Sequence, residues 1–293
     1  MITEIGEGDA TMIHPIAMGD AHMECRKLSE TVPVMTDLLA FEKIAGAPGS
    51  ATLKHPNTEW RLVVHEGGAE APQKLMHNHF GVRVATLKEI DAAHEYLKAR
   101  EQDYGIKQVG QPGYSHGSYS VYFLEPGTNG WEIECYETVL RKETGGTRLG
   151  GVRAPHWTEM LPSERFPGRG YVPQAFTHGT LAIGDLKTSW NFYANVLGLE
   201  VHQANDHVAY VKVPASKPYI VCAVRKDGKT FSPNFRFALK VESKDDVVTA
   251  RRWLAASGAE LGVTELGDLK ENGSVSFVLS DPDKNWWEIV AAS

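Results

Sequence analysis

The stretch that decides the fold is THGTLAIGDLKTSWNFYANVLGLEV, residues 177–201. Its first residues favour a strand, and Asp185 has the side chain of a helix N-cap. A helical segment follows, and Gly198 stands near its expected end. The stretch therefore predicts a strand, a helix and a further strand in close succession.

The chain contains this kind of pattern more than once. Three blocks of the first half reappear in the same order in the second half, at offsets of 156 to 158 residues. Such a period is far longer than a solenoid repeat and has the size of a domain. The matching pairs are LLAFEKI (38–44) with VLGLEVH (196–202), HNHFGVRVATLKEIDAAHEYLKARE (77–101) with NFRFALKVESKDDVVTARRWLAASGAE (234–260), and HGSYSVYFLEPGTNGWEIECYE (116–137) with NGSVSFVLSDPDKNWWEIVAAS (272–293).

Each half has the same internal order of elements. Alternating residues in HFGVRVAT, SYSVYFLE and WEIECYE predict strands, whereas 86–101 has the periodicity of an amphipathic helix. The sequences EPGTNG (125–130) and DPDKN (281–285) are typical of turns, so each half should end in a hairpin. We expect strand–helix–strands twice in each half.

Composition excludes several classes of protein. The chain has 293 residues, a net charge of −7 and three cysteines without a CxxC motif. We therefore expect no nucleic-acid partner, which would require an excess of basic residues, and no disulfide framework. No apolar run approaches the roughly 18 residues of a membrane span, and the N-terminus does not resemble a secretory signal. We expect a cytoplasmic protein that has no membrane partner.

The segment 137–176, between the two repeats, is rich in Gly, Pro and Arg and has no sustained period. It is too long for a simple connector. Two interpretations stay open: a linker wrapped around the molecule, or a segment that closes over a site.

The duplicated strand–helix–strands pattern, with histidines on early strands and a glutamate in a terminal WE strand, resembles the vicinal oxygen chelate superfamily. This group includes glyoxalase I, bleomycin- and fosfomycin-resistance proteins and type I extradiol dioxygenases. The resemblance implies an α+β fold of two tandem domains, each made of two βαβββ modules that form a cupped mixed sheet. The expected divisions are an N-terminal extension (1–19), a metal-binding domain (20–136), the long linker (137–176) and a degenerate, structural domain (177–293).

The resemblance places a metal site in the first half, with His22, His79 and Glu132 as ligands. Two imidazoles and one carboxylate on one side of a metal suit Fe(II), because substrate and O2 can take the remaining positions. Mn(II) fits the same ligands. The strict repeat offset aligns His178 with Asp20 and not with His22, so Asp20 stays open as first ligand.

Two other histidines also stay open as ligands. His14 is a further alternative to His22, and His77 is the rival of His79, because it lies two residues away on the same strand face.

Further residues favour the dioxygenases within this superfamily. In type I extradiol dioxygenases, a His and a Tyr stand where His65 and Tyr122 stand here. A neutral imidazole can take a proton from a catechol and return it, and a Tyr hydroxyl can hydrogen-bond the substrate oxygen. The resemblance therefore implies catalytic roles for His65 and Tyr122, and His116 is a further candidate.

The second half departs from the pattern. His178 and Glu288 remain, but Arg236 stands where the second His would be, and a guanidinium is not a plausible ligand of Fe(II). Val278 replaces the Tyr, and Cys222 stands where His65 would be. We expect Arg236 to pair with Glu288 and fill a metal pocket that no longer binds metal.

The resemblance thus implies an Fe(II)-dependent extradiol-type dioxygenase that cleaves a small aromatic diol with O2 and forms a homo-oligomer. One alternative is a glyoxalase-type isomerase or lyase, for which Glu24 is a candidate second carboxylate. The other is a non-catalytic binding protein, with Trp60, Trp131 and Tyr136 along an aromatic groove.

Overall fold

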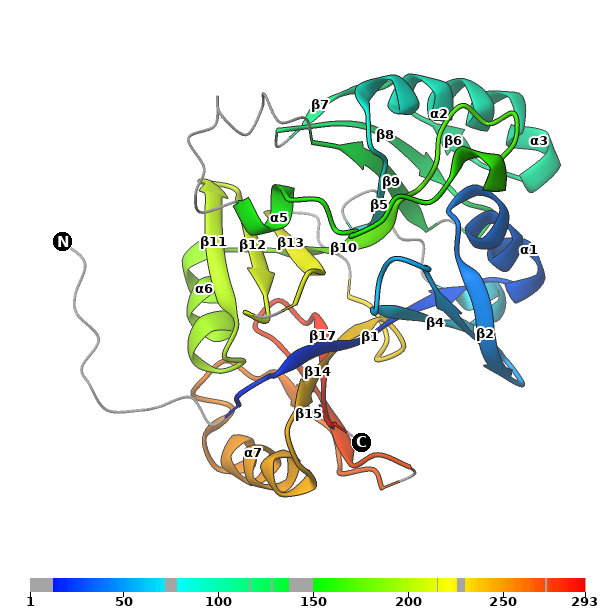
Figure 1. The fold of residues 1–293 in the computed structure, drawn as a ribbon. Coiled ribbons are helices and arrows are strands. Elements are labelled where there is room, and N and C mark those ends of the chain that lie inside the picture. The colour runs from blue at the N-terminus through cyan, green and yellow to red at the C-terminus, as the bar shows by residue number, and fades with distance from the viewer. Residues whose placement is uncertain are drawn as a thin grey trace.

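In the computed structural model, the chain forms two mixed β-sheets with helices on their outer sides (Figure 1). The structure describes residues 13–71, 78–115, 117–127, 129–136, 150–214, 216–225, 230–271 and 273–292. Among these residues, no helix is both long and apolar enough to cross a membrane.

The first sheet has eight strands in the described part of the chain, in the order β15-β16-β17-β14-β1-β4-β3-β2. Its strands come from the first and last quarters of the sequence. They are β1 (Ala17–Cys25), β2 (Glu42–Ala47), β3 (Ser50–Lys54), β4 (Arg61–Glu66), β14 (Arg236–Val241), β15 (Glu265–Leu266), β16 (Ser276–Ser280) and β17 (Trp286–Ala291).

The second sheet follows the order β11-β12-β13-β10-β5-β9-β8-β6, and β7 pairs with β8 off this path. Its strands come from the middle of the sequence. They are β5 (Phe80–Arg83), β6 (Gln108–Val109), β7 (Gly113–Ser115), β8 (Ser118–Leu124), β9 (Gly130–Cys135), β10 (Ala175–Ile183), β11 (Glu200–Asn205), β12 (Val208–Lys212) and β13 (Tyr219–Val224).

The longer helices begin at the caps that their sequences provide. The Asp185 side chain accepts a hydrogen bond of 2.7 Å from the Thr188 amide, which confirms it as the N-cap of α6. A capping box joins Thr86 and Glu89 at the start of α2, within the helix predicted at 86–101. The helices are α1 (Leu28–Pro33), α2 (Leu87–Ala99), α3 (Glu101–Tyr104), α5 (Gly150–Arg153), α6 (Leu186–Asn195) and α7 (Lys244–Ser257), with single-turn or π segments η1 (Val34–Leu38), η2 (Gly68–Glu70) and η4 (Ser163–Arg165).

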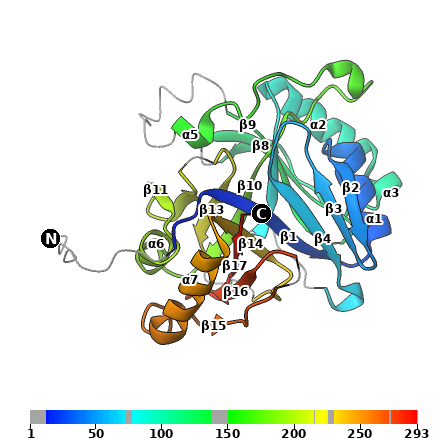
Figure 2. The ribbon, with the colours of Figure 1, turned by 60° about the horizontal axis from the view of Figure 1, so that its bottom comes forward.

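Each sheet combines one unit from each half of the sequence. β1 pairs antiparallel with β14, which joins the first unit of the chain to the last. β10 pairs antiparallel with β5, which joins the two middle units. Figure 2 shows the blue and orange-red strands side by side in one sheet. The predicted fold class, α+β with two cupped mixed sheets of βαβββ units, is confirmed.

This pairing differs from the expected division into a metal-binding domain (20–136) and a structural domain (177–293), each with a sheet of its own. The boundary at 137–176 separates the sequence repeats, but both sheets cross it. The physical reason is that the first strand of every unit has an open edge, and any other unit's first strand can fill it.

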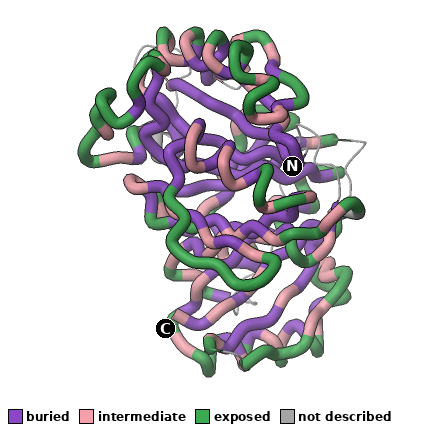
Figure 3. The backbone as a smooth tube through the Cα atoms, turned by 90° about the vertical axis from the view of Figure 1, so that its right-hand side faces the viewer, coloured by how far each residue is buried: buried purple, intermediate pink, exposed green. Residues whose placement is uncertain are grey.

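Aromatic side chains fill the interior where the sheets meet. Trp60 stacks on Phe176 with ring centroids 4.6 Å apart, and Phe237 contacts both Trp60 and Phe80. Gly179 lies against Phe237 so closely that an added Cβ would collide with the ring. Figure 3 shows buried backbone running through the interior of the molecule, and the buried apolar residues of both sheets belong to one core.

The described part of the linker, 150–176, packs along both sheets. The carbonyls of Val152 and Ala154 accept hydrogen bonds from Arg83 of β5, at 2.9 and 2.8 Å. Farther along, the Pro173 carbonyl lies 3.1 Å from His55 Nε2, and Tyr171 donates to the Leu38 carbonyl. These contacts fit the interpretation as a wrapped linker, while residues 137–149 lie outside the described residues.

Candidate metal centre

Three side chains that can bind a metal converge in the second sheet. His79 directly precedes β5, Glu132 lies in β9 and His178 lies in β10, and these strands are neighbours in the order β10-β5-β9. Gly81 of β5 is the register partner of both Glu132 and His178, so the two side chains flank the same point of β5. All three residues are buried, and their donor atoms lie within 4.8 Å of one another.

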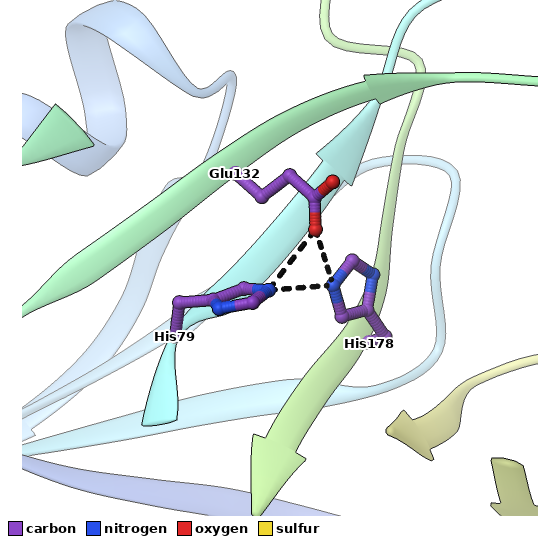
Figure 4. Close-up of side chains that lie close together, drawn as sticks. All are labelled: His79, Glu132 and His178. Carbon is purple, nitrogen blue, oxygen red and sulfur yellow. Dashed lines mark hydrogen bonds and ion pairs between the residues drawn. The ribbon is translucent and has the colours of Figure 1, made fainter. Parts of the chain in front are cut away.

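The distances fit a metal with right-angled ligands. Glu132 Oε2 lies 3.0 Å from His79 Nε2 and 3.1 Å from His178 Nε2, and the two nitrogens are 3.3 Å apart (Figure 4). Donors about 2.1 Å from a metal and at right angles to one another are separated by about 3.0 Å. Two imidazoles and one carboxylate in this arrangement occupy one face of an octahedron and leave the opposite face to other ligands.

The position of the His178 ring over β5 depends on a glycine. A Cβ built on Gly81 would collide with Cε1 and Nδ1 of the His178 ring. Only a residue without a side chain lets this imidazole lie across β5 and point Nε2 at Glu132.

The second nitrogen of His178 faces a buried carboxylate. His178 Nδ1 lies 3.1 Å from Thr177 Oγ1 and 3.5 Å from Glu134 Oε1. A carboxylate at this distance favours the tautomer with the proton on Nδ1, which leaves the Nε2 lone pair for a metal. Glu134 therefore orients the imidazole from behind.

Glu134 is itself held by Arg83, which is buried. Arg83 donates to Glu134 Oε1 from Nε at 3.0 Å and from Nη2 at 2.7 Å, and both side chains are almost fully buried. The guanidinium also donates to the linker carbonyls described above and to Tyr219. Since an uncompensated charge at this depth would be costly, the whole network keeps Glu134 ionised beside His178.

The electrostatics favour a charged centre. Burial opposes protonation of His178, but the carboxylates of Glu134 and Glu132 outweigh it and raise the pKa of His178 to about 9. Burial also disfavours the Glu132 carboxylate, yet hydrogen bonds from His178 and His79 hold its pKa well below the usual range. A metal that binds at Nε2 would take the place of the proton on His178, so binding releases a proton.

Tyr122 contacts the same carboxylate from the adjacent strand. Tyr122 is opposite Glu132 in the β8–β9 pairing, and its hydroxyl donates to Glu132 Oε1 at 2.8 Å. Burial and the charge of Glu132 raise the pKa of Tyr122, so the hydroxyl keeps its proton. The other carboxylate oxygen, Oε2, faces the two histidines.

A cavity of about 250 Å³ adjoins the three residues. Its far wall comes from the second half of the chain and is largely apolar and aromatic, with Tyr210, Val221 and Ala223. Tyr136 closes another side, and Arg225, which is exposed, lies at the rim. The space suits a small molecule with a flat apolar body and a polar edge directed at the donors.

The structure brings together three of the residues predicted from the sequence, His79, Glu132 and Tyr122. It does not bring His22 or His65 to them. His22 lies in β1 and His65 in β4 of the other sheet, where the rings stack and His22 Nδ1 is 3.0 Å from His65 Nε2. His178 takes the place assigned to His22, which corrects the predicted ligand set.

The remaining candidates lie elsewhere. Asp20 binds Arg61 through both carboxylate oxygens, at 2.8 and 2.7 Å, and His14 is exposed just before β1. Glu24 accepts a hydrogen bond from Asn234. His77 and His116 lie outside the described residues.

The predicted aromatic groove does not form from its three members. Tyr136 lines the cavity beside Glu132, whereas Trp131 is fully buried in the core and Trp60 lines a different cavity.

In the equivalent cup of the first sheet, two ion pairs line a cavity of about 230 Å³. Arg236 Nε lies 2.6 Å from Glu288 Oε2, as predicted, and Asp20 is paired with Arg61. Two guanidinium groups therefore neutralise the carboxylates where a cation would otherwise be needed.

The register of the strands explains why His22 is not the counterpart of His178. Gly179 pairs with Phe80 in one sheet and Ala21 with Phe237 in the other, and Phe80 and Phe237 are repeat equivalents. The residue before each, His178 or Asp20, is therefore equivalent, as the strict repeat offset indicates. The strict offset thus indicated from the sequence that His22 is not the counterpart of His178. Nothing in the sequence indicated that β10 pairs with β5, which is what brings His178 to His79 and Glu132.

Comparisons with known proteins agree with this architecture. Residues 175–289 match the family model described as Glyoxalase/Bleomycin resistance protein/Dioxygenase superfamily. Glyoxalase I from Zea mays is similar in structure, with a TM-score of 0.64 and 16% identity over 94% of this chain and 92% of that one. A proposed dioxygenase from Bacillus subtilis strain 168 has a TM-score of 0.62 and 12% identity over 95% and 86%. No curated protein matches the sequence.

At these identities the solved structures show the fold alone, and the family match rests on the third and fourth βαβββ units. The first two units have the same strand order and complete the same two sheets. Residues 175–289 are therefore similar to the glyoxalase/bleomycin resistance protein/dioxygenase superfamily, and nearly the whole chain has a fold similar to that of glyoxalase I from Zea mays.

Proposed function

We propose that this protein is an Fe(II)-dependent, extradiol-type dioxygenase that cleaves the ring of a small catechol-like substrate with O2. The observation that carries the proposal is the donor set of His79, His178 and Glu132, which can occupy one face of a metal. Among the described residues of the cavity, Val221 and Ala223 add apolar surface, and the other carboxylate, Glu134, is engaged by Arg83. Both diol oxygens and O2 would therefore have room at one metal ion.

Iron held by these residues would supply a path for electrons between substrate and O2, and Mn(II) suits the same donors. The protein's own groups do the rest. The apolar wall of Tyr210, Val221 and Ala223 holds the ring and excludes water. Tyr122 keeps its proton and can share it between Glu132 and a substrate oxygen.

The acid–base role predicted for His65 has no support from the arrangement, because His65 lies in the first sheet with His22. The role of Tyr122 is supported by its hydrogen bond to Glu132. His116 stays a prediction from sequence.

The test is anaerobic loading with Fe(II), followed by a panel of catechols and O2. We expect stoichiometric iron, uptake of one O2 per substrate and the absorbance of a ring-opened product. His178→Ala should lose iron and activity. His22→Ala is the matched control, because it removes a buried histidine of the equivalent strand in the other sheet, and it should keep both.

Thermal melts of both variants would show that the fold survives. Iron that stays in His178→Ala but leaves His22→Ala would contradict the assigned centre. A loaded protein that consumes no O2 with any catechol would contradict the reaction but not the centre.

A second candidate is a glyoxalase-type isomerase or lyase. It is favoured by Glu134, a second carboxylate that lines the cavity two residues after Glu132. Against it, Glu134 is engaged by Arg83. Turnover of an α-hydroxy carbonyl substrate with Ni(II) or Zn(II) in the absence of O2 would favour this reaction over ring cleavage.

A further inference from the structure

A second and larger cavity, of about 880 Å³, lies outside the candidate metal centre. We call it the linker groove. It is bounded by the start of β1, the loop 54–60 between β3 and β4, the linker residues 156–159, and the loop 216–218 before β13. It shares no lining residue with the cavity at Glu132.

Two buried polar side chains of this groove have no hydrogen-bond partner among the described residues. His156 is 2% exposed, and neither Nδ1 nor Nε2 has a partner. Trp60 is also 2% exposed, and its indole Nε1 has none. Buried polar groups in folded proteins are nearly always paired, so each unpaired group indicates a missing partner. Two such groups line one cavity, so a small molecule in that cavity would supply the missing partner.

The unpaired and positively charged groups that line the linker groove are mainly hydrogen-bond donors. The indole offers one N–H and no acceptor. Burial, and then the charge of Arg83, holds the pKa of His156 well below its ordinary value, so the neutral ring offers one N–H and one acceptor nitrogen. Lys54, a half-buried residue, and Lys217, an exposed one, add ammonium groups to the lining.

The acidic residues of the groove are placed differently. Glu59 and Glu159 are both exposed at its rim, where water screens their charge. The inner part therefore favours acceptor oxygens and negative charge. Apolar contacts are available beside it from Met18 and Pro218, which are buried.

We propose that the linker groove binds a small organic carboxylate. Its oxygens accept hydrogen bonds from Trp60 and His156, with Lys54 close by, and its apolar part lies against Met18 and Pro218. A carboxylate supplies several acceptor positions and the negative charge that this set of donors lacks. The inference does not depend on the reaction proposed for the metal centre.

Isothermal titration of the full-length, metal-loaded protein with benzoate and with benzamide tests the ligand class. The two probes have the same shape, but only benzoate carries the charge. We expect benzoate to bind and benzamide to bind at least tenfold more weakly.

Two conservative variants test whether benzoate binds in the linker groove. Trp60→Phe keeps the stacking on Phe176 and removes only the N–H, and His156→Phe keeps a ring against Tyr219. Each should weaken benzoate about tenfold, as expected for a lost hydrogen bond to a charged group. Trp131→Phe is the matched control, because Trp131 also has a buried, unpaired Nε1 but lies outside the groove, and its affinity should not change.

A last variant excludes the metal centre as the place where benzoate binds. His79→Ala should leave the affinity for benzoate unchanged. No binding of benzoate, equal binding of benzamide, or unchanged affinity in both Trp60→Phe and His156→Phe would overturn the proposal, as would loss of binding in His79→Ala. Circular dichroism melts would show that each variant is folded.

Discussion

At the scale of the residue, Glu134 acts on the candidate centre through His178. It lines the cavity, but its carboxylate faces Nδ1 of the imidazole and is fixed by Arg83. It is therefore a positioning residue, whose charge determines which nitrogen of His178 is available.

Glu134→Gln should weaken Fe(II) binding roughly 10- to 100-fold, because the amide no longer stabilises the Nδ1–H tautomer. Iron titration followed by a chelator competition measures the affinity. Glu134→Asp serves as the control that keeps the charge, and it should recover part of the loss. Equal affinity of the glutamine variant and the unaltered protein would show that Glu134 only fills space.

His55 makes a prediction about pH. The Pro173 carbonyl and the Asn57 amide engage its two ring nitrogens, and burial lowers its pKa from 6.5 to about 4. Between pH 6.5 and about 4, His55 is therefore protonated in the unfolded chain but neutral in the folded chain. The stability that His55 contributes is full above pH 6.5 and is lost as pH falls toward 4.

Between pH 7.5 and 5, this one residue should cost about 2 kcal/mol in the free energy of unfolding. Urea titrations at both pH values measure it, with His55→Asn as the comparison, which should be less stable at pH 7.5 but lose less on acidification. An identical loss in both proteins would assign the acid sensitivity to other groups.

At the scale of the element, the centre depends on the pairing of β10 with β5, which places His178 opposite Gly81. The predicted strands, hairpins and capped helices formed where periodicity and turn residues placed them, because these signals are local. Whether the His178 ring can lie across the paired strand, by contrast, depends on the size of the residue opposite it. At β5 and β10 that residue is Gly81.

Gly81→Ala should therefore abolish metal binding, since the new Cβ would occupy the place of the His178 ring. Displacing this ring in a packed core should also cost about 1–3 kcal/mol of stability. Gly113→Ala is the control, because a Cβ there meets nothing within 4 Å. Iron content and thermal melts distinguish the two, and a Gly81→Ala protein with full iron would contradict the geometry.

At the scale of the whole molecule, the candidate centre belongs to both halves of the chain. His79 and Glu132 come from the first half and His178 from the second, and each sheet is completed only when distant units pair. Neither half should be able to form the centre alone.

Expression of 1–145 and 146–293 as separate chains tests this. Together they should co-purify and bind one iron, whereas 1–145 alone should bind none and aggregate through the open edges of β1 and β5. Co-expression of 1–145 with a 146–293 chain carrying His178→Ala should give a complex without iron. Full iron binding by 1–145 alone would restore the interpretation of one site within the first half.

Sequence alone predicted the duplication, the βαβββ order and the Arg236–Glu288 ion pair, which follow from repeat offsets and from residue chemistry. His79, Glu132 and Tyr122 were singled out by the resemblance to a known superfamily, and the structure brings these three side chains together. Tyr122 and Glu132 could be placed together because a short turn fixes the register of their hairpin.

Only the tertiary structure decided which units pair, and with that whether His22 or His178 joins His79. All four units present a similar first strand with an open edge, so local patterns do not distinguish the possible pairings. The choice depends on packing between residues far apart in sequence, such as Gly81 beneath His178 and Gly179 against Phe237. The sequence could therefore place Tyr122 beside Glu132, which one hairpin holds together, whereas His178 joined them only through the pairing of β10 with β5.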